Sequence, residues 1–147
     1  MTQQRSAAAR EAWSLLAELW FGDAMGDRFH SACEAIDVSP PQLKALLSLV
    51  PGELEPMRAV ADRLHCDASW VTGMVDALEQ RGYVERTQHP SDRRIKVITI
   101  TSLGEKAKAK AIEALHEPPP VFADALTVTE LRTIRDLLRK VHAHSQD

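Results

Sequence analysis

The chain has 147 residues, the length of one compact domain, and only 5% of them are aromatic, which suits packed helices better than an aromatic-rich β-sandwich. Its formal net charge of −3 argues against a protein that spreads positive charge widely to bind nucleic acid without sequence preference. We see no signal peptide, and no apolar run approaches the ~18 residues needed to span a bilayer, so we expect a soluble cytoplasmic protein without membrane association.

The N-terminal pattern predicts one long amphipathic helix over residues 5–34. Its wide apolar stripe contains Trp13, Leu16 and Trp20. Gly22 and Gly26 weaken the helix locally. Tryptophans on such a terminal helix are more often core or dimer contacts than a cofactor site.

Two short helices are predicted next, each after a break. Ser39 caps a helix that runs to about Val50 and ends at Pro51-Gly52. The inward positions of this helix are Leu43, Leu46, Leu47 and Val50. A second helix runs from Pro56 to about Leu64 and is followed by the turn 65–67.

The following helix begins at a cap on Asp67 or Ser69 and ends before Gly82, where a left-handed cap is expected. Val71, Val75 and Leu78 face inward, with Met74 at the edge of that stripe. The opposite face carries Ser69, Thr72, Gly73, Asp76 and Gln80. A small polar face of this kind can approach the major groove of DNA closely.

A β-hairpin follows, with strands at 83–88 and 95–100 around the loop 89–94. The second strand alternates, with Ile98 and Ile100 on one face and Val97 and Thr99 on the other. We place Arg93 and Arg94 at the tip, where arginine can enter a minor groove. Together the helix pair and the hairpin predict a winged helix-turn-helix, mainly α with a small β-hairpin wing.

Positive charge concentrates in this region. Residues 81–110 hold eight basic and three acidic side chains, whereas the rest of the chain holds ten basic and eighteen acidic ones. Charge runs are usually solvated surface, so this distribution alone is a weak signal.

The C-terminal part reads as two helices around a proline-rich break. Thr101 or Ser102 begins the first, with a capping box from Ser102 to Glu105, and it runs to about residue 116. A second capping box, Thr127 to Glu130, opens the last helix. Its apolar positions with heptad-like spacing are Leu131, Ile134, Leu138 and Val141.

Residues 61–107 carry a dense motif. Its members are Val71, Thr72, Val75, Leu78, Glu79, Gly82, Tyr83, Val84, Arg86, Asp92, Arg94, Ile100, Thr101 and Gly104. In order and spacing this stretch closely resembles the MarR family of transcription regulators. Gly73 departs from the resemblance, because many members carry an arginine there.

The resemblance implies one MarR-like domain over 1–147 that forms an obligate homodimer. Residues 39–101 would make the winged DNA-binding lobe, and 5–34 with 102–145 a helical dimerisation lobe. The dimer contacts we expect are Trp13, Leu16, Trp20, Leu131, Ile134, Leu138 and Val141. The first and last helices carry more apolar surface than a small domain buries alone, which agrees with this expectation.

We therefore predict a sequence-specific transcriptional regulator, most simply a repressor, that binds a pseudo-palindromic operator in double-stranded DNA and is released by a small aromatic or anionic effector. The expected DNA-binding residues are Ser69, Trp70, Thr72, Gly73, Asp76, Arg86, Asp92, Arg93 and Arg94. In the family the wing acid, here Asp92, pairs with an arginine, for which Arg86 or Arg81 is a candidate. Trp70 could pack against a sugar or cover the helix pair.

Two alternatives stay open: a nonspecific or architectural DNA binder, and a thiol-based redox regulator using Cys33 or Cys66. The chain holds no phosphate loop, nucleophile elbow or HExxH motif, so an enzyme is not expected. Neither a cofactor nor a metal site is expected, because the six histidines are scattered and the cysteines lack metal-ligand spacing.

Overall fold

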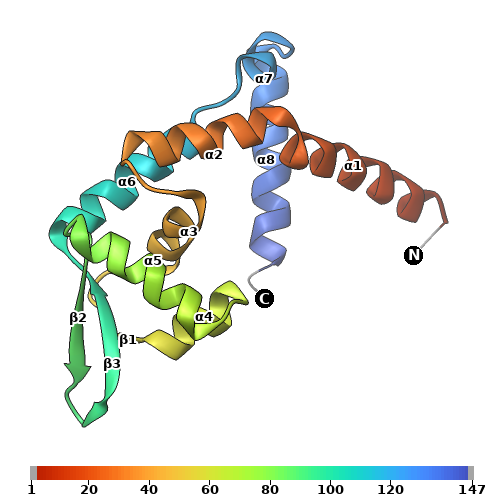
Figure 1. Cartoon of the computed structure of the whole chain (residues 1–147). Helices are drawn as coiled ribbons and strands as arrows, with labels where there is room; N and C mark the ends of the chain where they lie inside the picture. Colours follow the sequence, from red (N-terminus) through yellow and green to blue (C-terminus); the bar gives the residue numbers. More distant parts are fainter. Residues whose placement is uncertain (1–2, 146–147) are drawn as a thin grey trace. The chain divides into compact units, whose positions relative to one another are not determined.

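The computed structural model describes residues 3–145, which form two compact units that divide after His116. The first unit contains a lobe of helices with a small antiparallel sheet, and the second is helical (Figure 1). The predicted fold class, mainly α with a β-hairpin wing, is confirmed.

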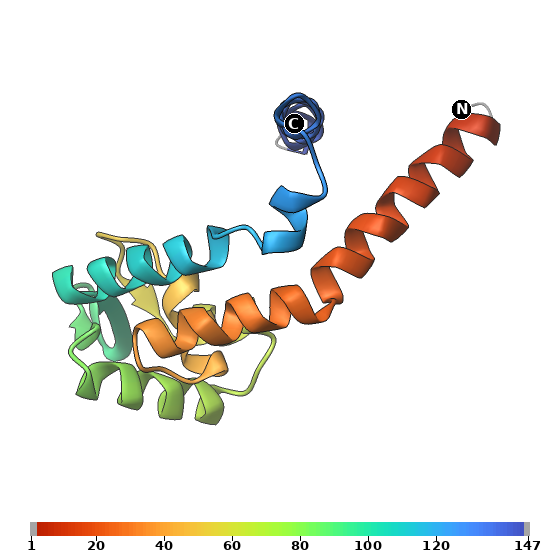
Figure 2. The same cartoon turned by 90° about the horizontal axis from the view of Figure 1, so that it is seen from above.

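The N-terminal helix is broken, and the prediction of one helix over 5–34 is wrong. Helix α1 (Gln3–Phe21) and helix α2 (Asp23–Ala35) meet at Gly22, which is extended, with φ −78° and ψ 171°. A Cβ placed on Gly22 would lie 2.8 Å from the carbonyl oxygen of Glu18, so this bend favours glycine. Figure 2 shows α1 leaving the lobe at the bend.

The lobe is built from five helices and a three-stranded sheet around one core. Its elements beyond α2 are α3 (Pro40–Ser48), β1 (Glu55–Pro56), α4 (Met57–Leu64), α5 (Ala68–Gln80), β2 (Val84–His89), β3 (Asp92–Ile100) and α6 (Ser102–His116). Helices α2 and α6 lie side by side (Figure 2). Large fully buried side chains include Leu43, Leu46, Leu49, Leu78 and Ile98.

The sheet has the strand order β1-β3-β2. Strand β1 is too short to be seen in the sequence, and it pairs Glu55 with Ile98 and Pro56 with Val97. Val97 and Ile98 are both fully buried, so β3 is covered on both of its faces here. The added strand beside β3 contributes to covering this part of the wing.

Helix α3 ends at Ser48, earlier than predicted. Leu49 turns into the core while Val50 is 43% exposed, so the inward position assigned to Val50 is wrong. The chain turns here because its backbone groups bind side chains from other elements: the Val50 N–H donates to Glu55 at 3.0 Å, and Lys108 Nζ donates to the Leu49 carbonyl at 2.6 Å.

Thr101, rather than Ser102, caps α6. Its hydroxyl accepts from the Gly104 N–H at 3.0 Å and donates to the Gly82 carbonyl at 2.6 Å. Gly82 has φ +74°, the left-handed conformation predicted for it. Gly104 packs so closely that an added Cβ would lie 1.9 Å from the Tyr83 carbonyl oxygen. These motif residues therefore tie the turn after α5 to the start of α6.

The second unit contains α7 (Pro120–Asp124) and α8 (Val128–His144). The predicted proline-rich break is present at 117–119, and Pro120 occupies the first turn of α7, where its missing N–H costs nothing. The capping box is confirmed: Thr127 N–H donates to Glu130 at 2.8 Å, and Glu130 N–H donates to Thr127 Oγ1 at 3.4 Å.

Candidate nucleic-acid interface

Helices α4 and α5 form the predicted helix-turn-helix pair. His65 ends α4 in the left-handed conformation, with φ 51°, and Asp67 is the N-cap residue of α5. Val60 and Ala61 of α4 and Val71 and Val75 of α5 are buried in the shared core. The turn is thus fixed by packing on both sides, which orients α5 in the lobe.

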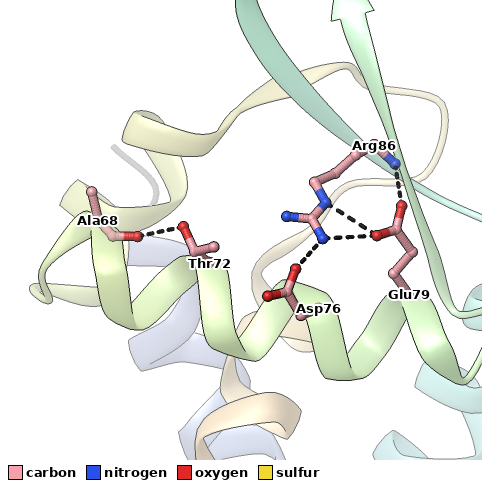
Figure 3. A network of polar contacts seen from close by, with 5 residues as sticks. All are labelled: Ala68, Thr72, Asp76, Glu79 and Arg86. Carbon is pink, nitrogen blue, oxygen red and sulfur yellow. Dashed lines mark hydrogen bonds and ion pairs between the residues drawn. The ribbon is translucent and has the colours of Figure 1, made fainter.

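The face of α5 opposite this core is open and small. Ser69, Thr72 and Gly73 are exposed, and a Cβ added to Gly73 would meet no atom within 4 Å. The Thr72 hydroxyl donates to the Ala68 carbonyl at 2.9 Å (Figure 3). This bond occupies the Thr72 hydroxyl proton within the helix and leaves the hydroxyl oxygen able to accept.

Arg86 of β2 is held by two carboxylates of α5. Its guanidinium pairs with Asp76 and with Glu79, the latter through Nε at 3.2 Å and a terminal nitrogen at 2.8 Å (Figure 3). The Arg86 N–H also donates to Glu79 at 3.3 Å. The wing and the candidate recognition helix are therefore joined by a polar cluster, which we call the Arg86 clamp (Asp76, Glu79 and Arg86).

The clamp changes the acidity of Glu79 and Arg86. Hydrogen bonding to Arg86 lowers the pKa of Glu79, and hydrogen bonding to both carboxylates raises the pKa of Arg86. Arg86 was predicted as a DNA contact, and its donors here are directed at protein carboxylates. Glu79 was noted only as a motif position; its spacing of three from Asp76, on one side of the helix, is the signal that could have revealed the pair.

The wing is tighter than predicted, with a two-residue turn at Pro90 and Ser91. The loop assignment for Arg93 and Arg94 is wrong, since both lie on β3. They lie where the register shifts: Gln88 pairs with Lys96 but His89 pairs with Asp92, so a bulge on β3 holds them next to the turn. Both arginines are exposed.

Asp92 acts locally. Its Oδ1 accepts from the Arg94 N–H at 3.0 Å, which steadies the bulge. The expected pairing with Arg86 or Arg81 is wrong, because Arg86 is bound in the clamp and Arg81 pairs with Asp37 at 3.3 Å. Asp92 therefore binds the backbone of the bulge at Arg94 rather than an arginine side chain.

The basic segment 81–110 divides into two groups. Arg81, Arg86 and Lys108 are engaged with protein oxygens. The exposed members on the wing are Arg93, Arg94 and Lys96. Lys106 and Lys110 of α6 are exposed as well, and the exposed positive charge of the wing itself lies on β3, in the same lobe as the small polar face of α5. A winged lobe of this kind can place a helix in a major groove and its wing on the adjoining backbone.

Trp70, in the first turn of α5, is 61% exposed. With Ser69, Gly73 and Met74 it lines one side of a shallow groove whose other side is the start of α3 at Ser39, Pro41 and Gln42. Of the two roles considered for Trp70, covering the helix pair does not agree with this exposure.

The predicted dimerisation residues lie on α1 of the first unit and on α8 of the second. On α1, Trp13, Leu16 and Trp20 are all exposed, and a neighbouring Phe21 is 85% exposed. On α8, Leu138 and Val141 are exposed and Leu131 and Ile134 half-buried. Each helix thus carries an uncovered apolar stripe.

The two cysteines differ in environment. Cys33 is buried, and burial raises the pKa of its thiol, which keeps it protonated and poorly reactive. Cys66 is half-buried in the turn before α5.

Within residues 3–145, no three His, Cys, Asp or Glu side chains are grouped as a metal site would require. None of the helices described is long and apolar enough to cross a membrane.

Both a family model and a curated relative that match this chain describe transcription regulators or their family. A family model described as MarR family matches residues 38–96, which span α3 to β3. The uncharacterized HTH-type transcriptional regulator YfiV of Bacillus subtilis is 32% identical over 112 residues, a match that covers 76% of this chain and 66% of YfiV.

Solved structures share the fold. The transcriptional regulator Tm0710 of Thermotoga maritima has a TM-score of 0.77 at 24% identity, covering 93% of this chain and 95% of that one. S. aureus MepR in its DNA complex has a TM-score of 0.62 at 20% identity, covering 82% of this chain and 90% of MepR. At these identities the likeness establishes the fold alone.

Proposed function

The chain belongs to the MarR family, and on this premise we propose that it is a DNA-binding transcriptional regulator rather than an enzyme. One observation carries the proposal: the open face of α5 and the exposed arginines of β3 lie on the same lobe, in the places where a winged helix-turn-helix meets a major groove and the backbone beside it. The MepR structure with DNA, which shares this fold, supports the same use of the lobe.

We propose further that the functional form is a homodimer. The apolar stripes of α1 and α8 would be covered in such a dimer, and exposed apolar surface of this kind marks interaction sites. A two-fold dimer presents two identical lobes, so its operator is a pseudo-palindrome with half-sites about one helical turn apart.

We also propose, from the family resemblance, that the protein represses transcription and that a small aromatic or anionic molecule relieves this repression. A ligand that binds the DNA-free form better than the DNA-bound form would release the operator by the difference in its two affinities. A thermal-shift screen of aromatic carboxylates, followed by release of operator from the protein in a gel shift, tests this part.

The experiment for the main proposal is selection of bound sequences from a random DNA pool by the full chain, followed by affinity measurements at several salt concentrations. We expect an enriched inverted repeat and an affinity that falls steeply with salt. Arg94→Ala should weaken binding while sedimentation still reports a dimer. Binding without any enriched sequence would favour an architectural protein and contradict the proposal.

A further inference from the structure

The N-terminal half of the open face of α5 lacks the side chains that usually read bases, whereas Gln80 lies on this face at the C-terminal end of the helix. Arginine, lysine, asparagine and glutamine make the bidentate contacts that distinguish base pairs. At the N-terminal end of α5, which enters the groove first, the exposed face has Ser69, Thr72 and Gly73 instead. The Thr72 proton is given to Ala68, and Asp76 is held in the Arg86 clamp. Few polar side-chain groups therefore remain at this end of α5 to hydrogen-bond base edges.

Trp70 is the large side chain that this end of the helix does offer. It lies one residue, about 100° of helix rotation, from Ser69, on the flank facing the start of α3. The residue is 61% exposed, although the core stripe of Val71, Met74 and Val75 is adjacent in sequence. An aromatic ring held at the entrance of a reading helix presents apolar surface to whatever the helix approaches.

We propose that Trp70 recognises thymine, by packing its indole against the C5-methyl group of one thymine in each half-site. This inference rests on the proposed function. The thymine methyl is the apolar group that base pairs present in the major groove, so it is the natural counterpart of an exposed apolar side chain. Gly73, one turn further along, leaves space for the close approach that this contact requires.

The expected loss of affinity follows from the removal of one methyl group from the contact. Burying one such group changes an affinity by about fourfold, hence about 15-fold when both half-sites of a dimer complex are altered. The polar pairing of the base is not involved, so the effect should be independent of salt, unlike the contribution of Arg93 and Arg94.

The test uses the operator selected from a random pool, with each thymine replaced in turn by deoxyuridine, which lacks the methyl group but pairs identically. Affinities are measured for the natural chain and for Trp70→Ala, Trp70→Phe and Ser69→Ala. Trp70→Phe retains an apolar ring, and Ser69→Ala changes the neighbouring residue, so both serve as matched controls. Circular dichroism confirms that each variant is folded.

We expect one thymine per half-site at which deoxyuridine weakens the natural chain, Trp70→Phe and Ser69→Ala, but not Trp70→Ala. Equal affinity for thymine and deoxyuridine throughout would overturn the inference, even if operator binding is specific. So would a Trp70→Ala variant that binds all operators more weakly but keeps its sensitivity to the methyl group, since that result assigns the ring to a sugar. Failure to enrich any operator would instead overturn the proposed function, and this inference with it.

Discussion

Replacing Arg86 by alanine tests whether the clamp positions the wing and masks charge on the reading helix. The change removes the ion pairs to Asp76 and Glu79 and leaves two carboxylates of α5 without their cation. The side chains are 22%, 47% and 40% exposed for Arg86, Asp76 and Glu79, so solvent screens part of each attraction. We therefore expect a loss of about 1 to 2 kcal/mol in the free energy of unfolding, and a fall of about 3–6 °C in Tm.

The effect on DNA binding can be worked out separately. One uncompensated charge about 10 Å from a phosphate in water contributes about 0.4 kcal/mol. Two or three phosphates lie within a Debye length of a groove-facing helix, so Arg86→Ala should cost about 1 kcal/mol, roughly fivefold in affinity.

The assay is fluorescence anisotropy of the selected operator with a double-mutant cycle on Arg86 and Asp76. If Arg86 acts by neutralising the helix carboxylates, Asp76→Asn should restore most of the affinity lost in Arg86→Ala, and Asp76→Asn alone should bind at least as tightly as the natural chain. A direct phosphate contact predicts otherwise: no rescue, and a salt dependence reduced by about one unit of slope in Arg86→Ala. That result would show a direct contact of Arg86 with DNA and would refute the proposal that it acts by neutralising the helix carboxylates.

Three further outcomes are expected. Gly104→Ala should destabilise the fold by about 2 to 4 kcal/mol, measured by denaturant unfolding, because its Cβ would collide with the Tyr83 carbonyl; a Tm within 2 °C of the natural chain would contradict this. Because the pKa of Glu79 is lowered, the contribution of this carboxylate to stability is complete above the usual pKa of 4.5 and is lost as the pH falls below that value. Glu79→Gln should therefore flatten the acid limb of a curve of Tm against pH. An unchanged acid limb would argue against the pairing of Glu79 with Arg86. Trp20→Ser and Leu138→Ser should each raise the dissociation constant of the dimer in sedimentation runs, and no shift would place the interface elsewhere.

The elements set by local pattern could be predicted from the sequence. The stripe Val71, Val75 and Leu78 identified α5, and the capping box at Thr127 and Glu130 identified the start of α8. Each signal is formed by residues that lie within a few positions of one another in the sequence. The left-handed turn at Gly82 was equally local. These features depend on helix periodicity and cap chemistry, which the chain carries in itself.

Features made by distant partners could not be predicted in this way. Strand β1 exists only because Glu55 and Pro56 meet β3, some forty residues later. The partners of Arg86 depend on how the wing packs against α5, and the family resemblance offered Arg86 as a candidate partner of Asp92 instead. The place of Arg93 and Arg94 followed from a β-bulge, a register shift that alternating hydrophobicity does not reveal.

Hydroxyl-radical footprinting of the selected operator tests most directly whether a dimer places two winged lobes on one palindrome. We predict protection that is symmetric about the centre of the operator, with two protected segments about one helical turn apart. The outer flanks of these segments should lose protection in Arg94→Ala. Uniform protection along the DNA, or a single asymmetric segment bound by one chain, would contradict the account.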